Sequence, residues 1–253
     1  MKVTFLGTGT SQGVPIIACN CEVCASDDVK DKRLRTSIMI EDGEDVFVID
    51  TGPDFRQQML RENVKNLTAV IYTHEHKDHV AGMDDVRAFN FTLKKDIDLY
   101  ATEQVQKALK NDFHYAFADF KYPGVPLVNL ITIDNTPFTI SQTKFIPIEV
   151  MHHKLPVLGF RIGDLAYITD ANYISEEEKL KLKGVKVLVL NALRRKDHIS
   201  HFTLEQAIDL MNEIKPETGY FTHISHQLGK HEEASKELPD FVELAYDGLK
   251  IEV

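Results

Sequence analysis

A chain of 253 residues can hold one large domain or two small ones, and its hydrophobic fraction of 43% is ordinary for a globular protein. No run of eighteen apolar residues occurs and the first residues lack a signal-peptide pattern, so we expect no membrane span and a cytoplasmic protein. The formal net charge of −10 argues against a large nucleic acid as substrate, because such partners need a basic surface. A small anionic substrate remains compatible, since metal ions can supply positive charge locally.

The hydrophobic pattern shows no repeat and no linker, and we interpret residues 1–253 as a single α/β (α+β) domain. The predicted strands cover Val3–Leu6, Ser37–Ile40, Val46–Ile49, Ala69–Tyr72, Leu99–Ala101, Phe145–Met151, Val157–Ile162, Leu165–Thr169, Val185–Leu190, Tyr220–Phe221 and Lys250–Val253. The predicted helices cover Phe55–Arg61, Glu103–Asn111, Ser175–Leu182 and Leu204–Ile214, the last with Thr203 as its N-cap. The pair Asp247-Gly248 predicts a hairpin turn between two apolar runs.

The first candidate site is a group of three cysteines, Cys19, Cys21 and Cys24, within six residues. A disulfide would leave one thiol unpaired and is not expected in a reducing compartment. The spacing C-x-C-x-x-C is better explained by three zinc ligands that need a fourth, with reduced loop thiols as the alternative.

The strongest signal follows the strand Ala69–Tyr72 and reads His74-Glu75-His76-Lys77-Asp78-His79. In an extended segment His74 and His76 project to the same side, and the chain then turns so that Asp78 and His79 can face a second metal ion. Imidazole suits zinc and related ions, and carboxylate also tolerates Mn²⁺.

One such segment cannot fill two metal sites, and other strand ends offer further ligands. These are His152 and His153 after one strand, Asp170 after the next, and His223 after a late one. Taken singly, each is more often a cap or a surface residue than a ligand. A carboxylate at a strand end can bridge two ions through its two oxygens.

The order H-x-H-x-D-H, His, Asp and His resembles the metallo-β-lactamase superfamily over nearly the whole chain. More narrowly, Gly7-Thr8-Gly9-Thr10-Ser11 with Gly13-Val14-Pro15, the cysteines, and Thr222-His223-Ile224-Ser225-His226-Gln227 resemble the PhnP-type phosphodiesterases. The resemblance implies a four-layer αββα sandwich, hydrolysis of small or cyclic phosphodiesters, and a homodimer.

Carried over, the resemblance implies that His74, His76 and a histidine of the third motif bind a first metal ion. Asp78, His79 and His223 would bind a second one, and Asp170 would bridge the two, so that Asp78 counts among the catalytic residues. For the third motif we favour His152 over His153, because His152 continues the apolar face of Ile146, Ile148 and Val150. A one-residue bulge would reverse that choice.

The resemblance also supplies the fourth ligand of the cysteine site, which is His226. A Cys₃His site is closed and tetrahedral, so its zinc ion would be structural. It would fasten the loop at about residues 7–35 to the strand end that carries His223 and brace that ligand.

Three further residues have predicted roles around the site. Asp50, after Val46–Ile49, resembles the superfamily carboxylate that orients ligands instead of binding metal. Arg87 could contact a substrate phosphate, but a surface ion pair is the preferred interpretation. His201, on a loop 22 residues before His223, resembles the PhnP-type general acid that protonates the leaving group; His198 is its local rival.

The leading hypothesis is a dinuclear phosphodiesterase with two catalytic Zn²⁺ or Mn²⁺ ions, one structural Zn²⁺ and a small phosphodiester substrate. The two catalytic metal ions would make hydroxide available at neutral pH for in-line attack on phosphorus. Alternatives are RNA processing of the tRNase Z kind, thioester or lactone hydrolysis, and a non-catalytic metal-binding protein. The acidic net charge weakens the RNA alternative, and the presence of every expected ligand weakens the last one.

Overall fold

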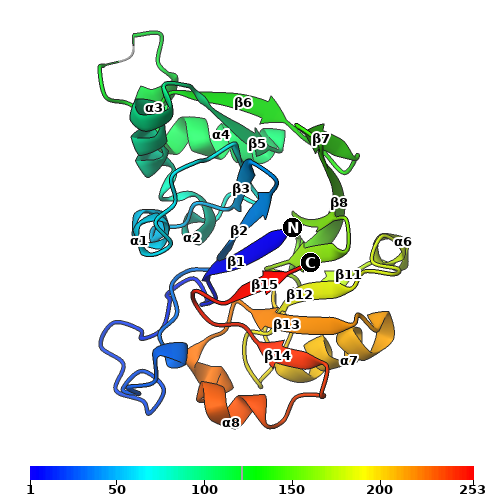
Figure 1. The fold of residues 1–253 in the computed structure, drawn as a ribbon. Coiled ribbons are helices and arrows are strands. Elements are labelled where there is room, and N and C mark those ends of the chain that lie inside the picture. Colours follow the sequence, from blue (N-terminus) through cyan, green and yellow to red (C-terminus); the bar gives the residue numbers. More distant parts are fainter. Residues whose placement is uncertain (121) are drawn as a thin grey trace.

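The computed structural model describes residues 1–120 and 122–253, and in this part of the chain two β-sheets lie between helices (Figure 1). The first sheet has the strand order β15-β1-β2-β3-β4-β5-β6. Its strands are β1 (Lys2–Gly7), β2 (Ser37–Asp42), β3 (Asp45–Ile49), β4 (Ala69–Ile71), β5 (Ile97–Ala101), β6 (Val128–Thr132) and β15 (Lys250–Glu252).

The second sheet has the strand order β11-β8-β9-β10-β12-β13-β14, and β7 pairs with β8 at its margin. Its strands are β7 (Phe138–Ile140), β8 (Thr143–His152), β9 (Leu155–Ile162), β10 (Leu165–Ile168), β11 (Tyr173–Ile174), β12 (Val187–Asn191), β13 (Thr218–Thr222) and β14 (Val242–Leu244). The first and last strands of the chain, β1 and β15, are antiparallel partners, so the two termini lie side by side (Figure 1).

Helices cover the outer face of each sheet. Those on the first sheet are α1 (Phe55–Arg61), α2 (Lys77–Val80), α3 (Arg87–Leu93), α4 (Glu103–Asp112) and α5 (His114–Phe117). Those that follow the strands of the second sheet are α6 (Glu176–Leu180), α7 (Leu204–Ile214) and α8 (His231–Ser235). Short 3₁₀ turns occur at Val29–Asp31, Met83–Val86 and His226–Leu228. Thr203 caps α7 as predicted, because its side chain accepts a hydrogen bond from Gln206 N.

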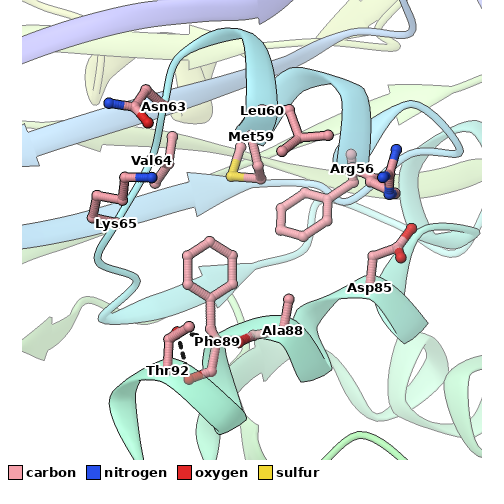
Figure 2. A pocket seen from close by; sticks show the side chains of 11 residues that line it. Arg56, Met59, Leu60, Asn63, Val64, Lys65, Asp85, Ala88, Phe89 and Thr92 are labelled. Carbon is pink, nitrogen blue, oxygen red and sulfur yellow. Dashed lines mark hydrogen bonds between the residues drawn. The ribbon is translucent and has the colours of Figure 1, made fainter.

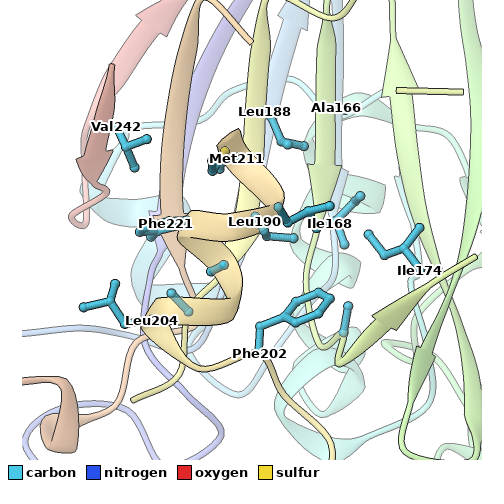
Figure 3. Close-up of a cluster of buried hydrophobic side chains, with 14 of the residues drawn as sticks. Ala166, Ile168, Ile174, Leu188, Leu190, Phe202, Leu204, Met211, Phe221 and Val242 are labelled. Atoms are coloured by element: carbon cyan, nitrogen blue, oxygen red, sulfur yellow. The ribbon is translucent and has the colours of Figure 1, made fainter. Parts of the chain in front are cut away.

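Three clusters of buried apolar side chains separate these four layers. In β2, Ile38 and Ile40 belong to the cluster between the sheets, whereas Met39 belongs to the cluster under the outer helices. That alternation is the two-residue period of a strand buried on both faces. On the other side of the molecule, α7 packs against β10, β12 and β13 through residues such as Met211 and Leu204 (Figure 3). The predicted four-layer αββα sandwich is confirmed.

The direction of the strands explains where the site lies. Strands β3, β4, β5 and β6 are mutually parallel, and so are β10, β12, β13 and β14. Their carboxyl ends therefore gather at one edge of each sheet. The residues just beyond β3, β10 and β13 are Asp50, Asp170 and His223, all with left-handed backbone (φ 66°, 54° and 55°). Each of these strands thus turns sharply where it delivers a polar side chain.

One prediction, the hairpin turn at Asp247-Gly248, is wrong. Asp247-Gly248 does not close a hairpin, because β14 pairs with β13 in the second sheet whereas β15 pairs with β1 in the first. The segment instead crosses from one sheet to the other. The Asp247 carboxylate accepts hydrogen bonds from Thr8 Oγ1 and Leu34 N, both at 2.8 Å, and these long-range bonds fix the turn.

Among residues 1–120 and 122–253, the helices are all too short or too polar to cross a bilayer. A cavity of about 410 Å³ lies between α1 and α3 on the outer helical layer (Figure 2). Its walls are mostly apolar, with Met59, Val64 and Phe89 facing its interior and Arg56 and Lys65 at its margin. None of the predicted metal ligands lines this cavity.

Candidate metal centre

The segment after β4 folds as its sequence predicts. His74 and His79 are buried, whereas His76 is exposed at the N-cap of α2 and opens the cluster to solvent. The ring centroid of His74 lies 4.6 Å from that of His76 and 4.2 Å from that of His79. The short helix α2 begins immediately after His76 and places Asp78 and His79 in its first turn.

A first group of candidate ligands consists of Asp78, His79, Asp170 and His223, each with one donor atom within 4.8 Å of the others. His79 Nε2 lies 3.2 Å from Asp78 Oδ2 and 3.2 Å from Asp170 Oδ2. His223 Nε2 lies 3.1 Å from Asp170 Oδ1 and 3.7 Å from Asp78 Oδ2. Four side chains, two from helix α2 and one beyond each of the strands β10 and β13, thus converge on a common point.

A second group contains His152, Asp170 and His201, again within 4.8 Å of one another. His152 also faces the first motif, with ring centroids 5.7 Å from His74 and 5.1 Å from His76. Its Nδ1 donates to Ser200 O at 2.8 Å, which leaves Nε2 for the site.

Of the two adjacent histidines, the structure brings His152 to the cluster and leaves His153 exposed outside it. His152 pairs with Leu155 as the last residue of β8, and His153 has a left-handed backbone with φ 59°. The sharp turn therefore follows His152, and the period-two reasoning holds up to that residue.

The structure places His201 inside the cluster. It is buried, with its ring centroid 4.5 Å from His152 and 4.7 Å from His223. His201 Nδ1 lies 3.9 Å from Asp170 Oδ1. His198 is less buried and lies 5.0 Å from His201, ring to ring. The loop therefore directs His201, rather than His198, into the cluster.

Several buried nitrogens in the cluster lack a hydrogen-bond partner among the described residues. They are His79 Nε2, His201 Nδ1 and both ring nitrogens of His223. Buried polar atoms without partners are costly, and they concentrate here around shared carboxylate oxygens. Imidazole and carboxylate donors are the ligands that Zn²⁺ and Mn²⁺ take in proteins, so the residues present fit a metal centre.

The electrostatics of the bare residues point the same way. Burial disfavours a charged imidazole, but Asp170 and Asp78 outweigh it and raise the pKa of His223 to about 9. Burial likewise opposes ionisation of Asp170, but His223 and His79 outweigh it and hold the pKa of that carboxyl well below its usual range. The carboxylates are thus ionised at neutral pH and offer negative charge that a divalent cation would neutralise.

Asp50 lies behind this cluster, as expected for an orienting residue. Its Oδ2 accepts from His79 Nδ1 at 2.7 Å and from Thr73 Oγ1 at 2.8 Å, and its Oδ1 accepts from Thr73 N at 2.9 Å. These bonds direct His79 Nε2 toward the cluster and hold the start of the motif segment. Thr73 was not singled out from sequence, although it immediately precedes the motif. Arg87 forms the surface ion pair that we preferred, 3.0 Å from Asp84.

The cysteines gather around His226. Its Nδ1 lies 3.3 Å from Cys19 Sγ, 3.3 Å from Cys21 Sγ and 3.5 Å from Cys24 Sγ. A hydrogen bond from Cys24 N lowers the pKa of the Cys21 thiol to about 6, which favours the thiolate that binds metal. The three sulfurs and one nitrogen fit a tetrahedral zinc ion.

The chain is similar to several known proteins. A solved structure described as a new diphosphatase from the PhnP family superposes with a TM-score of 0.93 at 41% identity, covering 100% of this chain and 97% of that one. An octanoyltransferase from Porphyromonas gingivalis is 41% identical over 99% of this chain, but the chain spans only 51% of that protein's length. Coenzyme PQQ synthesis protein B from Methylorubrum extorquens is 30% identical over 76% of this chain and 72% of its own length.

Residues 46–224 match the family described as the Beta-lactamase superfamily domain. This match covers the H-x-H-x-D-H segment, His152, Asp170 and His223. The chain therefore belongs to the metallo-β-lactamase superfamily and is of the PhnP type.

Proposed function

We propose that this protein is a dinuclear metal-dependent phosphodiesterase that acts on small or cyclic phosphodiesters. The observation that carries the proposal is that Asp170 belongs to both groups of candidate ligands. Its Oδ2 faces His79 and its Oδ1 faces His223 and His201. A carboxylate placed in this way is suited to bridge two ions, with His74, His76 and His152 around one and Asp78, His79 and His223 around the other.

When bound, two such metal ions would activate water and offset negative charge on the phosphoryl group. The residues of the chain have separate tasks around it. Asp50 fixes the orientation of His79, and Ser200 O fixes that of His152. Exposed His76 marks the side from which substrate enters. His201 is the proposed proton donor to the leaving oxygen.

The test is a substrate panel on protein stripped with chelator and reloaded with Zn²⁺ or Mn²⁺. The panel contains bis(p-nitrophenyl) phosphate, ribose and nucleoside cyclic phosphates, a nucleoside diphosphate ester, an octanoyl thioester and a lactone. We expect metal-dependent turnover of at least one phosphoester, and an Asp170→Asn variant prepared in parallel excludes a contaminating hydrolase. Failure of every phosphoester with fully loaded protein would overturn the proposal.

Acyl-thioester hydrolysis is the second candidate, and one observation favours it. The 41% identical relative from Porphyromonas gingivalis is named for octanoyl transfer, although this chain spans about half of that protein. Turnover of the octanoyl thioester alone, abolished in Asp170→Asn, would support this second candidate over the first.

A further inference from the structure

Asn191, the last residue of β12, is a fully buried polar residue in a strand that is otherwise apolar. It belongs to neither group of candidate ligands. We propose that Asn191 is a positioning residue of the metal centre, which sets both the bridging carboxylate and the proton-donor loop. The proposal rests on the assignment of Asp170, His152 and His201 made above.

The side chain of Asn191 clamps a single residue, Ala171. Asn191 Oδ1 accepts from Ala171 N at 2.8 Å, and Asn191 Nδ2 donates to Ala171 O at 3.0 Å. Ala171 directly follows Asp170, whose backbone is left-handed with φ 54°. That conformation is unfavourable for a residue with a Cβ, so it needs support from its surroundings. The clamp supplies this support by fixing the peptide unit after Asp170.

A second arm of the same network reaches the proton-donor loop. Ala171 O also accepts a hydrogen bond from Phe202 N at 2.8 Å, and Phe202 directly follows His201. One residue before His201, Ser200 O accepts from His152 Nδ1. The position of Ala171 thus governs Asp170 on one side and the segment that holds His152 and His201 on the other. Asn191 acts on all of them without touching the reacting atoms.

The chain contains a matched control in Asn90 on α3. Asn90 Oδ1 accepts from Leu127 N at 3.0 Å, and its Nδ2 donates to Leu127 O at 2.8 Å and to Lys95 O at 2.9 Å. Asn90 is buried like Asn191 and clamps one residue through the same pair of bonds. Leu127 immediately precedes β6 and lies outside both groups of candidate ligands. The Asn90→Ala variant therefore shows how much stability is lost when a buried asparagine that holds one backbone residue is removed.

The experiment compares Asn191→Ala with Asn90→Ala in Mn²⁺ binding, followed by electron paramagnetic resonance of free Mn²⁺. Mn²⁺ is the probe because thiolates bind it poorly, so that the cysteine site does not contribute. Both variants should unfold at lower temperature. Only Asn191→Ala should bind Mn²⁺ more weakly, by about 10- to 100-fold, as for other residues that orient ligands. Equal Mn²⁺ affinity in the two variants would overturn the proposal.

If Asn191→Ala does not fold, the isosteric Asn191→Asp serves in its place. It keeps an acceptor for Ala171 N but loses the donor to Ala171 O, and it should also bind Mn²⁺ more weakly than Asn90→Ala. Wild-type affinity in Asn191→Asp would contradict the inference. Mn²⁺ binding is measured without substrate. The binding result therefore tests the role of Asn191 even if the proposed phosphodiesterase activity is not found.

Discussion

His226 Nδ1 lies 3.3 Å from Cys19 Sγ, although 207 positions separate the two residues. The same region is joined by backbone bonds, since Ile224 N donates to Thr8 O at 2.8 Å and Thr10 N donates to Ile224 O at 3.1 Å. Ile224 directly follows His223, a candidate catalytic ligand. The cysteine loop is therefore attached to the strand end that delivers His223, and a zinc ion there would brace that attachment.

This attachment predicts the behaviour of Cys21→Ser. The variant should lose one zinc ion per chain and unfold at lower temperature, because a structural zinc contributes folding free energy directly. Metal content by mass spectrometry and thermal unfolding measure the two effects. Glu22→Gln, an exposed neighbour in the same loop, is the control and should keep both. Full zinc content and an unchanged melting temperature in Cys21→Ser would refute the structural-zinc hypothesis.

The shared carboxylates predict a severe effect at Asp78. Asp78→Ala removes a group within 3.2 Å of His79 Nε2 and should lower phosphodiesterase activity by several orders of magnitude while the fold persists. Circular dichroism and steady-state kinetics at defined metal loading measure the outcome. Asp85→Ala, which removes a carboxylate outside the candidate ligand groups, should keep near-normal activity. Near-normal activity in metal-loaded Asp78→Ala would exclude Asp78 as a ligand of the second ion.

Much of the candidate site could be predicted because its signals are local. The ligands directly follow apolar strands, and parallel strands end at the same edge of a sheet, so sequence order translates into spatial proximity. The choice of His152 over His153 also followed from alternation along β8.

Other features depend on partners far along the chain. Strands β6, β7, β11 and β14 were not predicted, because they have five residues or fewer and a short strand depends on packing against its neighbours. Asp247 resembled a hairpin residue, and only the pairing of β14 with β13 and of β15 with β1 reveals that the segment crosses between the sheets. Asn191 gave a weak signal as a polar residue at a strand end, but its role requires the contact with Ala171, twenty residues away.

A pH-dependent stability is predicted at His231, away from the metal centre. Burial, followed by the nearby Arg33, lowers the pKa of His231 from its ordinary value of 6.5 to about 4. Arg33 Nη2 donates to the neutral ring at Nδ1, 3.1 Å away. The folded state disfavours protonation of His231. The stability that the neutral ring contributes is therefore present above pH 6.5 and is lost as the pH falls toward 4.

The test replaces His231 by asparagine, whose amide oxygen can accept from Arg33 without titrating. Because the pKa of His231 lies well below 6.5, the melting temperature of the wild-type protein should fall further between pH 7 and pH 4.5 than that of His231→Asn. His114→Asn, at an exposed position, should follow the wild type. Parallel curves for wild type and His231→Asn would show that His231 does not contribute to acid sensitivity.

The last prediction decides between two roles for His201. Its place beside His152 and Asp170 also suits a metal ligand, whereas a general acid must be protonated. Burial and His223 lower the pKa of His201 to about 2, and an anionic phosphodiester beside the ring would favour the protonated form and oppose that shift.

General-acid catalysis matters most when the leaving alkoxide is basic and little when it is p-nitrophenolate. If His201 is the acid, His201→Ala should slow an alkyl phosphodiester by about 10²–10⁴-fold, slow a p-nitrophenyl ester much less, and keep its metal ions. Kinetics on both substrates are measured alongside metal content, with His198→Ala as the matched control on the same loop, which should show no such difference between leaving groups. Loss of metal together with equal losses on both substrates would make His201 a ligand. Equal losses with unchanged metal content would assign it to phosphate binding instead of proton transfer.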